Sequence, residues 1–351
     1  MILRRLVALG MTVLMWAGTA TAQTEWVPYE GNPVIPGAEA DEWPGLYRWP
    51  EAVIVVDGTY HMFFTGTSVA FLVAHEIGHA TSPDGISWTM DPQNPVMTPE
   101  AEGDWEADSY VSLAAIHDGT QFRMWYGGCD SGGFCQIGMA TSPDGSVWTR
   151  YSENPVYGTG PVGSFDYGGA IPGTVIRRGG LYHMWYSATE EPTFFATGTI
   201  GYATSSDGVS WVRHPLPVLE PGPLQWESYI VYGPGVIFDG ASYHMWYTGL
   251  WGSGTSYFGA QIGYATSPDG ISWTKDPDNP IDVFGDWKEQ PRVLLHADRR
   301  ECEMFYNNPK YDEFSVNRAT SSCRAFRQIR RPSGRRMPAG GRGSQDAMRH
   351  P

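Results

Sequence analysis

The sequence contains no run of about 20 apolar residues, the length that a membrane-spanning helix requires. An apolar stretch near the N-terminus, residues 6–17, is too short to cross a bilayer. Arg4 and Arg5 precede this stretch and Ala20-Thr21-Ala22 follows it, an arrangement typical of a secretory signal. We therefore predict that residues 1–22 are a signal peptide and that the protein is secreted or periplasmic, with no membrane attachment after cleavage.

Basic residues are also scarce, with 23 Lys and Arg against 38 Asp and Glu, so the formal net charge is −15. Nucleic acid is therefore not an expected partner, because phosphate binding needs a basic face. Eight of the 23 basic residues lie in residues 324–351, which lack apolar periodicity and are rich in Pro and Gly. We predict that this segment is a basic disordered tail.

Cysteine is rare too, and the four cysteines fit an oxidising compartment. Cys129 and Cys135 flank a Gly-rich turn and could bridge a hairpin, which leaves Cys302 and Cys323 as a second pair. Free thiols are the alternative, because spacing alone does not establish pairing.

Aromatic residues and turn formers are abundant, with 15 Trp, 19 Tyr, 14 Phe, 43 Gly and 27 Pro. This mixture favours many short strands joined by tight turns. A strand motif of the form Y-H-M-W-Y recurs about every 60 residues, and its repeat methionines are Met62, Met124, Met184, Met245 and Met304. A second motif, I-G-x-A-T-S-x-D-G-x-x-W, follows the first four copies, at 77–88, 137–148, 200–211 and 262–273.

Each repeat predicts four antiparallel strands. Asp-Gly turns separate the first two strands and Ser-Pro-Asp-Gly or Ser-Ser-Asp-Gly turns separate the last two, as in tight hairpins. Four-stranded units repeated around an axis form a β-propeller. The last repeat lacks its final strand, whereas the segment Trp26 to Val34 has the spacing of that strand's W-x5-N-P-[VI] motif. We therefore predict an all-β fold over residues 23–323, a five-bladed propeller whose ring is closed by the N-terminal strand.

The stretch H-E-I-G-H, from His75 to His79, matches the HExxH signature of zinc proteases. That signature needs a helix, where both histidines share one face. Here the stretch aligns with the third strand of the other repeats, which would separate the two histidines by roughly 13 Å. Zinc cannot bridge this distance, so we predict no zinc site and a packing role for His79.

The first strand of each repeat is predicted to line the central channel, and each brings a carboxylate. The candidate catalytic residues are Glu51, Asp108, Asp166, Glu227 and Glu289. Converging carboxylates suit glycoside cleavage, in which one is protonated and another ionised. Candidate sugar-binding residues from the same strands are Arg48, Trp49, Tyr110, Tyr167, Tyr232 and Arg292. The alternative is that Glu106, Asp166 and Glu227, which each follow an aromatic residue, occupy a repeated polar position of the scaffold.

The N-P-V-I-P-G opening and the D-G-x-Y-H-M and I-G-Y-A-T-S units make the chain resemble the propeller glycosidases of families 43, 32, 68 and 130. The resemblance covers residues 24–322 and implies extracellular action on plant or microbial polysaccharides or oligosaccharides. Family 43 would imply a base Asp on the first blade, a tuning Asp on the second and an acid Glu on the third. Asp108 fits the second position, whereas Trp49-Pro50 replaces Asp-Pro and Asp166 replaces the Glu.

The leading hypothesis is a glycosidase in which Glu51 and Asp166 form the base and acid pair, Asp108 tunes their pKa, and Glu227 and Glu289 are alternates. The rival hypothesis is a non-catalytic propeller that binds carbohydrate or protein. We predict no cofactor or metal. Relatives sometimes hold a calcium ion in the channel, but the sequence shows no ligand set for one.

Overall fold

The computed structural model describes residues 25–37, 43, 47–67, 75–99, 105–107, 109–192, 198–253, 256–281, 284–285, 287–310 and 313–323. These residues form strands joined by turns and one short 3-10 helix, η1 (Gln225–Glu227), and contain no α-helix. The all-β prediction is therefore confirmed. No helix within these ranges is long and apolar enough to cross a membrane. The predicted signal peptide, residues 1–22, and the predicted tail, residues 324–351, lie outside the described residues.

The strands pair into antiparallel groups of four, which we name after their innermost strands. The β2 group contains β2 (Tyr47–Val56), β3 (Thr59–Thr67), β4 (Glu76–Ser82) and β5 (Thr89–Met90). The β6 group contains β6 (Ser109–His117), β7 (Phe122–Cys129), β8 (Cys135–Ser142) and β9 (Thr149–Arg150). The β10 group contains β10 (Gly169–Arg178), β11 (Leu181–Thr189), β12 (Gly198–Ser205) and β13 (Trp211–Arg213). The β14 group contains β14 (Ile230–Phe238), β15 (Tyr243–Ser253), β16 (Ser256–Ser267) and β17 (Thr274–Lys275).

The β18 group is built from both ends of the described chain. It contains β18 (Glu289–His296), β19 (Glu301–Lys310), β20 (Glu313–Ser322) and β1 (Val27–Pro28). Val27 pairs with Thr320 and Pro28 with Ala319, so the N-terminal strand is the outermost strand of this sheet, as predicted. Single parallel bridges, Gly169–Cys135 and Gly198–Ile230, link the β6, β10 and β14 groups into one twelve-stranded sheet.

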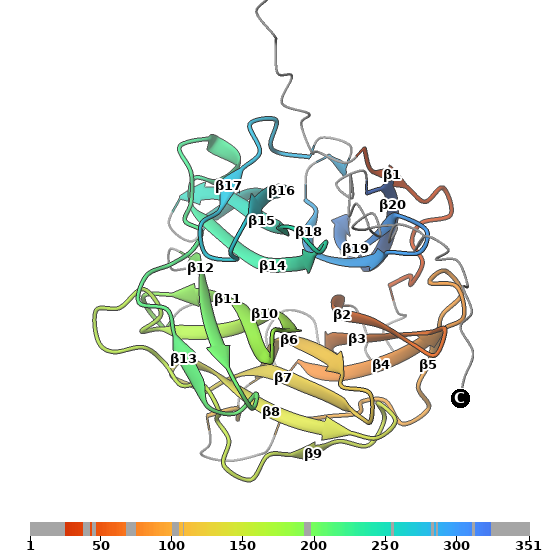
Figure 1. Cartoon of the computed structure of the whole chain (residues 1–351), viewed down its shortest axis with the longest axis horizontal. Coiled ribbons are helices and arrows are strands. Elements are labelled where there is room, and N and C mark those ends of the chain that lie inside the picture. The colour runs from red at the N-terminus through yellow and green to blue at the C-terminus, as the bar shows by residue number, and fades with distance from the viewer. Residues whose placement is uncertain are drawn as a thin grey trace, which may run out of the picture.

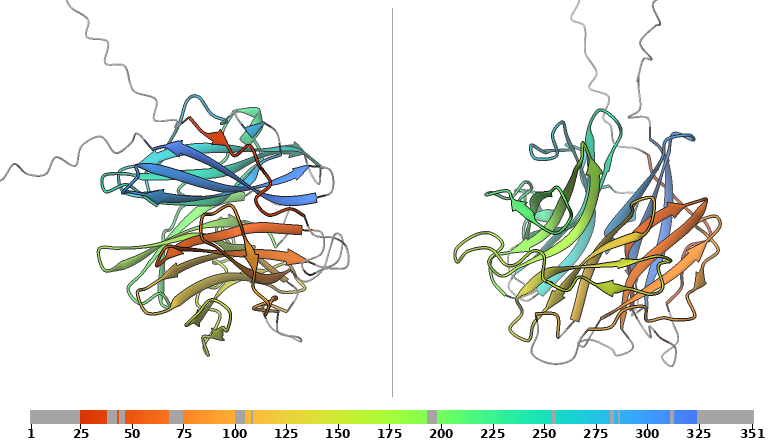
Figure 2. Two further views of the ribbon diagram at one scale, coloured as in Figure 1. Left: turned by 90° about the vertical axis from the view of Figure 1, so that its right-hand side faces the viewer. Right: turned by 60° about the horizontal axis from the view of Figure 1, so that its bottom comes forward.

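The groups follow one another in chain order around a common centre, and the first strand of each group lies nearest that centre (Figure 1). The β2 group, in orange, lies beside the β18 group, in blue (Figure 2). Phe64 and Met62 of the β2 group share a hydrophobic cluster with Phe305 of the β18 group. Between other groups, Trp125 donates to the carbonyl of Gly208 and Trp185 to that of Gly270. The aromatic residues of the repeated strand therefore pack one group against the next.

The repeated turns are held by their own side chains. In the first copy, Ser82 Oγ accepts the N–H of Gly85, and Asp84 accepts the N–H groups of Ile86 and Ser87. Trp88 then donates its ring N–H to the Gly85 carbonyl. Gly85 has a φ of +73°, a value that favours glycine. The same bonds recur in the other three copies, which explains why this turn sequence is repeated.

The W-x5-N-P motif is also a pairing device. Asn94 Oδ1 accepts the N–H of His79 while its Nδ2 donates to the His79 carbonyl. The amide thereby continues the sheet beyond β5, and Asn154 and Asn279 do the same for Met139 and Tyr264. Asn32 forms the matching pair of bonds with Arg318, which fastens the N-terminal segment to β20.

The H-E-I-G-H stretch lies in and just before β4, a strand, as predicted. His79 is buried, stacks on Phe63 with ring centroids 4.8 Å apart, and contacts Asp91 through Nδ1 at 2.9 Å. His75 instead packs against Trp49 in a tilted arrangement, with ring centroids 4.9 Å apart. The two histidines thus have different surroundings and do not form a metal-binding pair. Disulfides join Cys129 to Cys135 and Cys302 to Cys323.

Candidate active site at the channel mouth

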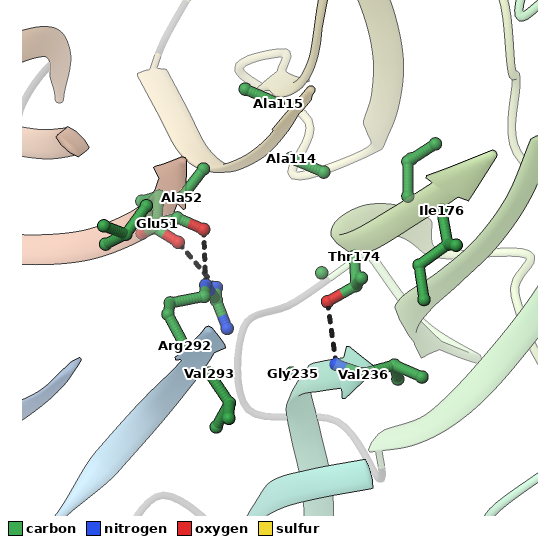
Figure 3. Close-up of a pocket in the computed structure, with 13 residues that line it drawn as sticks. Glu51, Ala52, Ala114, Ala115, Thr174, Ile176, Gly235, Val236, Arg292 and Val293 are labelled. Carbon is green, nitrogen blue, oxygen red and sulfur yellow. Dashed lines mark hydrogen bonds and ion pairs between the residues drawn. The ribbon is translucent and has the colours of Figure 1, made fainter. Parts of the chain in front are cut away.

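The innermost strands surround a pocket of about 150 Å³ on the central axis. Each of these strands contributes to its lining, and each has a register shift against its neighbour close to this level. Small residues, including Ala52, Ala114 and Gly235, leave room on the axis (Figure 3). Thr174 contributes a hydroxyl, but it already bonds the Pro234 carbonyl and the Val236 N–H. We call the end of the channel where these strands begin the channel mouth.

Glu51 of β2 and Arg292 of β18 form a buried ion pair between neighbouring innermost strands. Arg292 Nη2 lies 2.8 Å from Glu51 Oε2, and Arg292 Nε donates to the Glu51 carbonyl at 2.5 Å (Figure 3). The carboxylate also accepts hydroxyls from Ser112, at 2.6 Å, and Thr65, at 3.0 Å. Arg292 reaches further to the carbonyl of Gly233, at 3.2 Å. One guanidinium group therefore ties together four of the innermost strands.

Burial raises the pKa of Glu51, although Arg292 and the two hydroxyls favour its charged form. Its carboxylate oxygens are already occupied by Ser112, Thr65 and Arg292. A carboxylate that served as a base in a reaction would need to exchange one of these donors for its substrate. The contacts therefore fit a structural and electrostatic role for Glu51 better than the role of base.

Among the candidate carboxylates that the structure describes, Glu289 has the most open coordination, although it does not line the pocket. It begins β18 and is partly buried. Tyr232, at the same end of β14, donates its hydroxyl to Glu289 Oε2. Burial raises the pKa of Glu289 above the usual glutamate value, and the Tyr232 bond only partly opposes this. A carboxyl group of raised pKa on an innermost strand can hold a proton for donation.

Asp166 and Glu227 do not line the pocket, and each is held by an ion pair elsewhere. Asp166 is ion-paired with Arg213 of β13 at 2.7 Å and accepts the Tyr186 hydroxyl at 2.9 Å. Glu227 is ion-paired in the same way with Lys275 of β17 at 2.7 Å and accepts Tyr247 at 2.8 Å.

Glu106 repeats this arrangement, since Arg150 of β9 binds it at 3.0 Å. The three carboxylates thus form equivalent triads with a tyrosine and a cation of the outermost strand. The structure favours the alternative of a repeated scaffold position, and it does not support Glu51 and Asp166 as a base and acid pair. Asp108 lies outside the described residues.

The predicted sugar-binding residues differ in their surroundings. Trp49, Tyr232 and Arg292 lie near the start of innermost strands, and Trp49 is partly exposed, with its ring 4.9 Å from that of His75. Arg48 is buried and donates to the carbonyl of Pro36 at 2.5 Å.

Tyr110 is fully buried, donates to the Thr98 carbonyl and packs on Tyr126, so it belongs to the core. Tyr167 is partly buried against Phe134, edge to face at 5.7 Å. Trp49 and Tyr232 are therefore the aromatic residues best placed to contact a ligand at the channel mouth.

Some contributors were missed in the sequence. Thr65 and Ser112 bind Glu51, and Asn307 is fully buried beside Glu289. Thr65 and Asn307 both stand three residues after a repeat methionine, where the repeats vary in polarity. This variation in polarity is the sequence signal from which Thr65 and Asn307 could have been predicted. Within the described ranges, no three His, Cys, Asp or Glu residues gather in a metal-binding arrangement.

The comparisons with known proteins agree with this architecture. A family model described as the N-terminal domain of glycosyl hydrolases family 32 matches residues 45–166. A glycosyl hydrolase structure from Bacteroides ovatus aligns with a TM-score of 0.64 at 16% identity, covering 85% of this chain and 93% of that one. A thermostable family-43 glycoside hydrolase aligns with a TM-score of 0.59 at 18% identity, covering 83% and 90%.

The chain resembles the propeller glycosidases. Among curated relatives, an uncharacterized protein of Mycobacterium tuberculosis is 29% identical over 201 residues, 54% of this chain. A 1,2-beta-oligomannan phosphorylase of Thermoanaerobacter is 28% identical over 138 residues, 36% of this chain and 44% of that protein. The match spans 65% of the length of the M. tuberculosis protein. At this distance the likeness to solved propeller glycosidases establishes the fold, and the reaction has to be argued from the site.

Proposed function

We propose that this chain is a secreted, glycoside-active protein whose four-stranded groups form a closed five-bladed propeller with its site at the channel mouth. Two contacts support closure of the ring: the pairing of β1 with β20, and the bonds from Arg292 to Glu51 and Ser112. The two disulfides and the leader-like residues 1–22 support export. N-terminal sequencing of the exported protein should find Gln23 as its first residue, and an intact Met1 would contradict export by this route.

Glu289 is the proposed proton donor. The observation that carries this assignment is its place at the start of an innermost strand, with a raised pKa and a single hydrogen bond, from Tyr232. Protonation of the leaving oxygen is the step that every glycoside cleavage of this type needs. The partly exposed face of Trp49 supplies a surface for a sugar ring.

The attacking group distinguishes two reactions. Hydrolysis requires a second, ionised carboxylate to activate water, and Asp108 is the remaining sequence candidate for that role. Phosphorolysis would need inorganic phosphate in place of the activated water. Because the Thermoanaerobacter relative is named a phosphorylase, one arm of the assay has to contain inorganic phosphate.

The test is turnover of a panel of mannosides, arabinosides, xylosides and fructosides, each with and without inorganic phosphate. We expect turnover by the wild-type protein and a loss of at least about 100-fold in kcat for Glu289→Gln, which cannot donate a proton. Glu303→Gln is the matched control, because Glu303 is also a buried glutamate but is ion-paired with Arg318 in the outer part of the β18 group. Wild-type rates in Glu289→Gln would overturn the assignment.

A non-catalytic carbohydrate-binding propeller is the second candidate. It is favoured by the occupied coordination of Glu51 and by the triads that hold Asp166 and Glu227. Calorimetric binding of a glycan with no turnover in either arm of the panel would support this candidate and exclude the enzyme.

A further inference from the structure

Asn307 of β19 is a buried amide that the fold leaves unused. Its side chain is 0% exposed, and neither Oδ1 nor Nδ2 has a hydrogen-bond partner in the part of the chain that the structure describes. A buried amide without partners costs about 1–3 kcal/mol of stability. Such a group calls for an explanation, because buried polar side chains in native proteins are usually hydrogen-bonded.

The equivalent positions in the other groups explain what this position normally does. The residues three places after the repeat methionines are Thr65, Gly127, Ser187, Thr248 and Asn307. Ser187 Oγ accepts the N–H of Gly233, and Thr248 Oγ1 accepts the N–H of Gln290, each from the innermost strand of the next group. Ser187 and Thr248 therefore bond the innermost strand of the next group where its register shifts, whereas Thr65 donates to Glu51 within its own group.

Asn307 faces a strand that cannot offer this bond. In β14, Gly235 pairs with Trp246, and Gly233 stands two residues before Gly235. In β18, Arg292 pairs with Phe305, and Gln290 stands two residues before Arg292. In β2, Ala52 pairs with Phe63, so the corresponding residue, two positions before Ala52, is Pro50. Proline has no backbone N–H.

The β10 group also has a proline at this place, Pro172, and it faces Gly127. A Cβ added to Gly127 would lie 3.2 Å from Pro172 Cδ, so this pair has no polar side chain to satisfy. Asn307 is thus a polar side chain at this position whose corresponding residue in the next group is a proline.

The neighbour that can use this amide is Glu289. Glu289 and Asn307 are directly paired across β18 and β19, so their side chains lie on the same face of the sheet. The Glu289 carboxyl accepts one bond, from Tyr232, whereas an ionised carboxylate has room for several. We propose that Asn307 is a positioning residue for Glu289, whose Nδ2–H donates to the carboxylate after Glu289 has given up its proton.

This assignment rests on the proposed role of Glu289. In the proposed reaction the proton moves from the Glu289 carboxyl to the leaving oxygen, and the negative charge remains on Glu289. Asn307 transfers no proton, but its hydrogen bond stabilises the ionised carboxylate and so assists the transfer. Together with Tyr232 it would hold Glu289 from two sides.

The test is the titration of Glu289 by carbon-13 NMR of glutamate-labelled protein, with Glu289→Gln used to assign the signal. Asn307→Leu removes the donor and should raise the pKa of Glu289 by about one unit. Asn307→Ala, a smaller change that also removes the donor, guards against misfolding of the leucine variant and should shift the titration in the same direction. Urea unfolding should show that Asn307→Leu is as stable as the wild type or more stable, because the unpaired amide is gone.

Ser187→Ala is the matched control, because Ser187 holds the equivalent position with its hydrogen bond made. It should lose about 1 kcal/mol of stability and leave the Glu289 titration in place. An unchanged titration in both Asn307 variants, or a marked loss of stability in Asn307→Leu, would overturn the proposal. This outcome is separate from a failure of the proposed function, which would appear as absence of turnover in the wild-type protein.

Discussion

Arg292 and Glu51 lie 241 positions apart in the chain, and their side chains meet at 2.8 Å. Both are almost completely buried, with exposed fractions of 5% and 1%. The ion pair joins the innermost strands of the first and last groups, and both residues line the pocket on the axis. The same contact therefore stabilises the fold and forms part of the pocket wall.

Breaking this pair should be costly. Arg292→Met leaves the Glu51 carboxylate buried without its cation, and we expect a loss of about 3–5 kcal/mol in the free energy of unfolding by urea. The double variant Glu51→Met with Arg292→Met should recover about 2 kcal/mol or more of this loss, because it removes the uncompensated charge as well. Additive losses in the two single variants and the double variant would show that the pair is not coupled.

The triads predict stability effects away from the axis. Glu227→Gln weakens the contacts to Lys275 and Tyr247, and should lower the free energy of unfolding by about 1–2 kcal/mol. The purified variant should keep the kcat of the wild type on the responsive glycoside. If Glu227→Gln had normal stability but no turnover, Glu227 would have to be assigned a catalytic role.

Because of His61, we expect the free energy of unfolding to decrease in weak acid. Burial, followed by the neighbouring His79 and His117, lowers the pKa of His61 to about 4. Because the unfolded chain binds this proton below about pH 6.5 and the folded chain does not, stability is lost as the pH falls from about 6.5 to about 4. We expect on the order of 1–2 kcal/mol, less than the full linkage value because the ring is partly exposed.

Urea unfolding at intervals across this pH range checks the prediction for His61. His61→Gln should flatten the dependence. His214→Gln serves as the control, because His214 has its Nδ1 bonded to the Leu216 carbonyl at the exposed edge of the β10 group. An equal slope in the wild type and His61→Gln would contradict the assignment.

The Cys302–Cys323 disulfide closes a segment of 21 positions that ends where β20 ends. Replacing both cysteines with serine should lower the free energy of unfolding by about 3 kcal/mol. Thiol alkylation of the unfolded, unreduced wild-type protein should label no cysteine. Labelling at Cys302 or Cys323 would contradict the pairing.

The repeats made the strands and turns predictable, because each turn carries the side chains that hold it. Ser82, Asp84 and Trp88 bond within their own turn, so the local sequence determines the local structure. The pairing of Asn94 with His79 is nearly as local, and it recurs wherever the motif recurs. The fold could therefore be derived from one chain without its relatives.

The site was less predictable, because the role of a carboxylate depends on its partner. The sequence pattern makes Asp166 and Glu227 catalytic candidates, but each meets a cation on the outermost strand of its group. A signal for this was present, since Arg213 and Lys275 both stand two residues after a repeat tryptophan. The contact between Arg292 and Glu51 had no such local signal, because it depends on how the first and last groups meet.

The central claim is that a saccharide binds at the channel mouth with its glycosidic oxygen at Glu289. A crystal structure of Glu289→Gln with an oligosaccharide from the responsive class would measure this directly. We predict that the glycosidic oxygen lies within about 3.2 Å of the side-chain amide at position 289, with a sugar ring near Trp49. A saccharide bound elsewhere on the propeller, or one whose glycosidic oxygen lies beyond hydrogen-bond reach of position 289, would contradict the account.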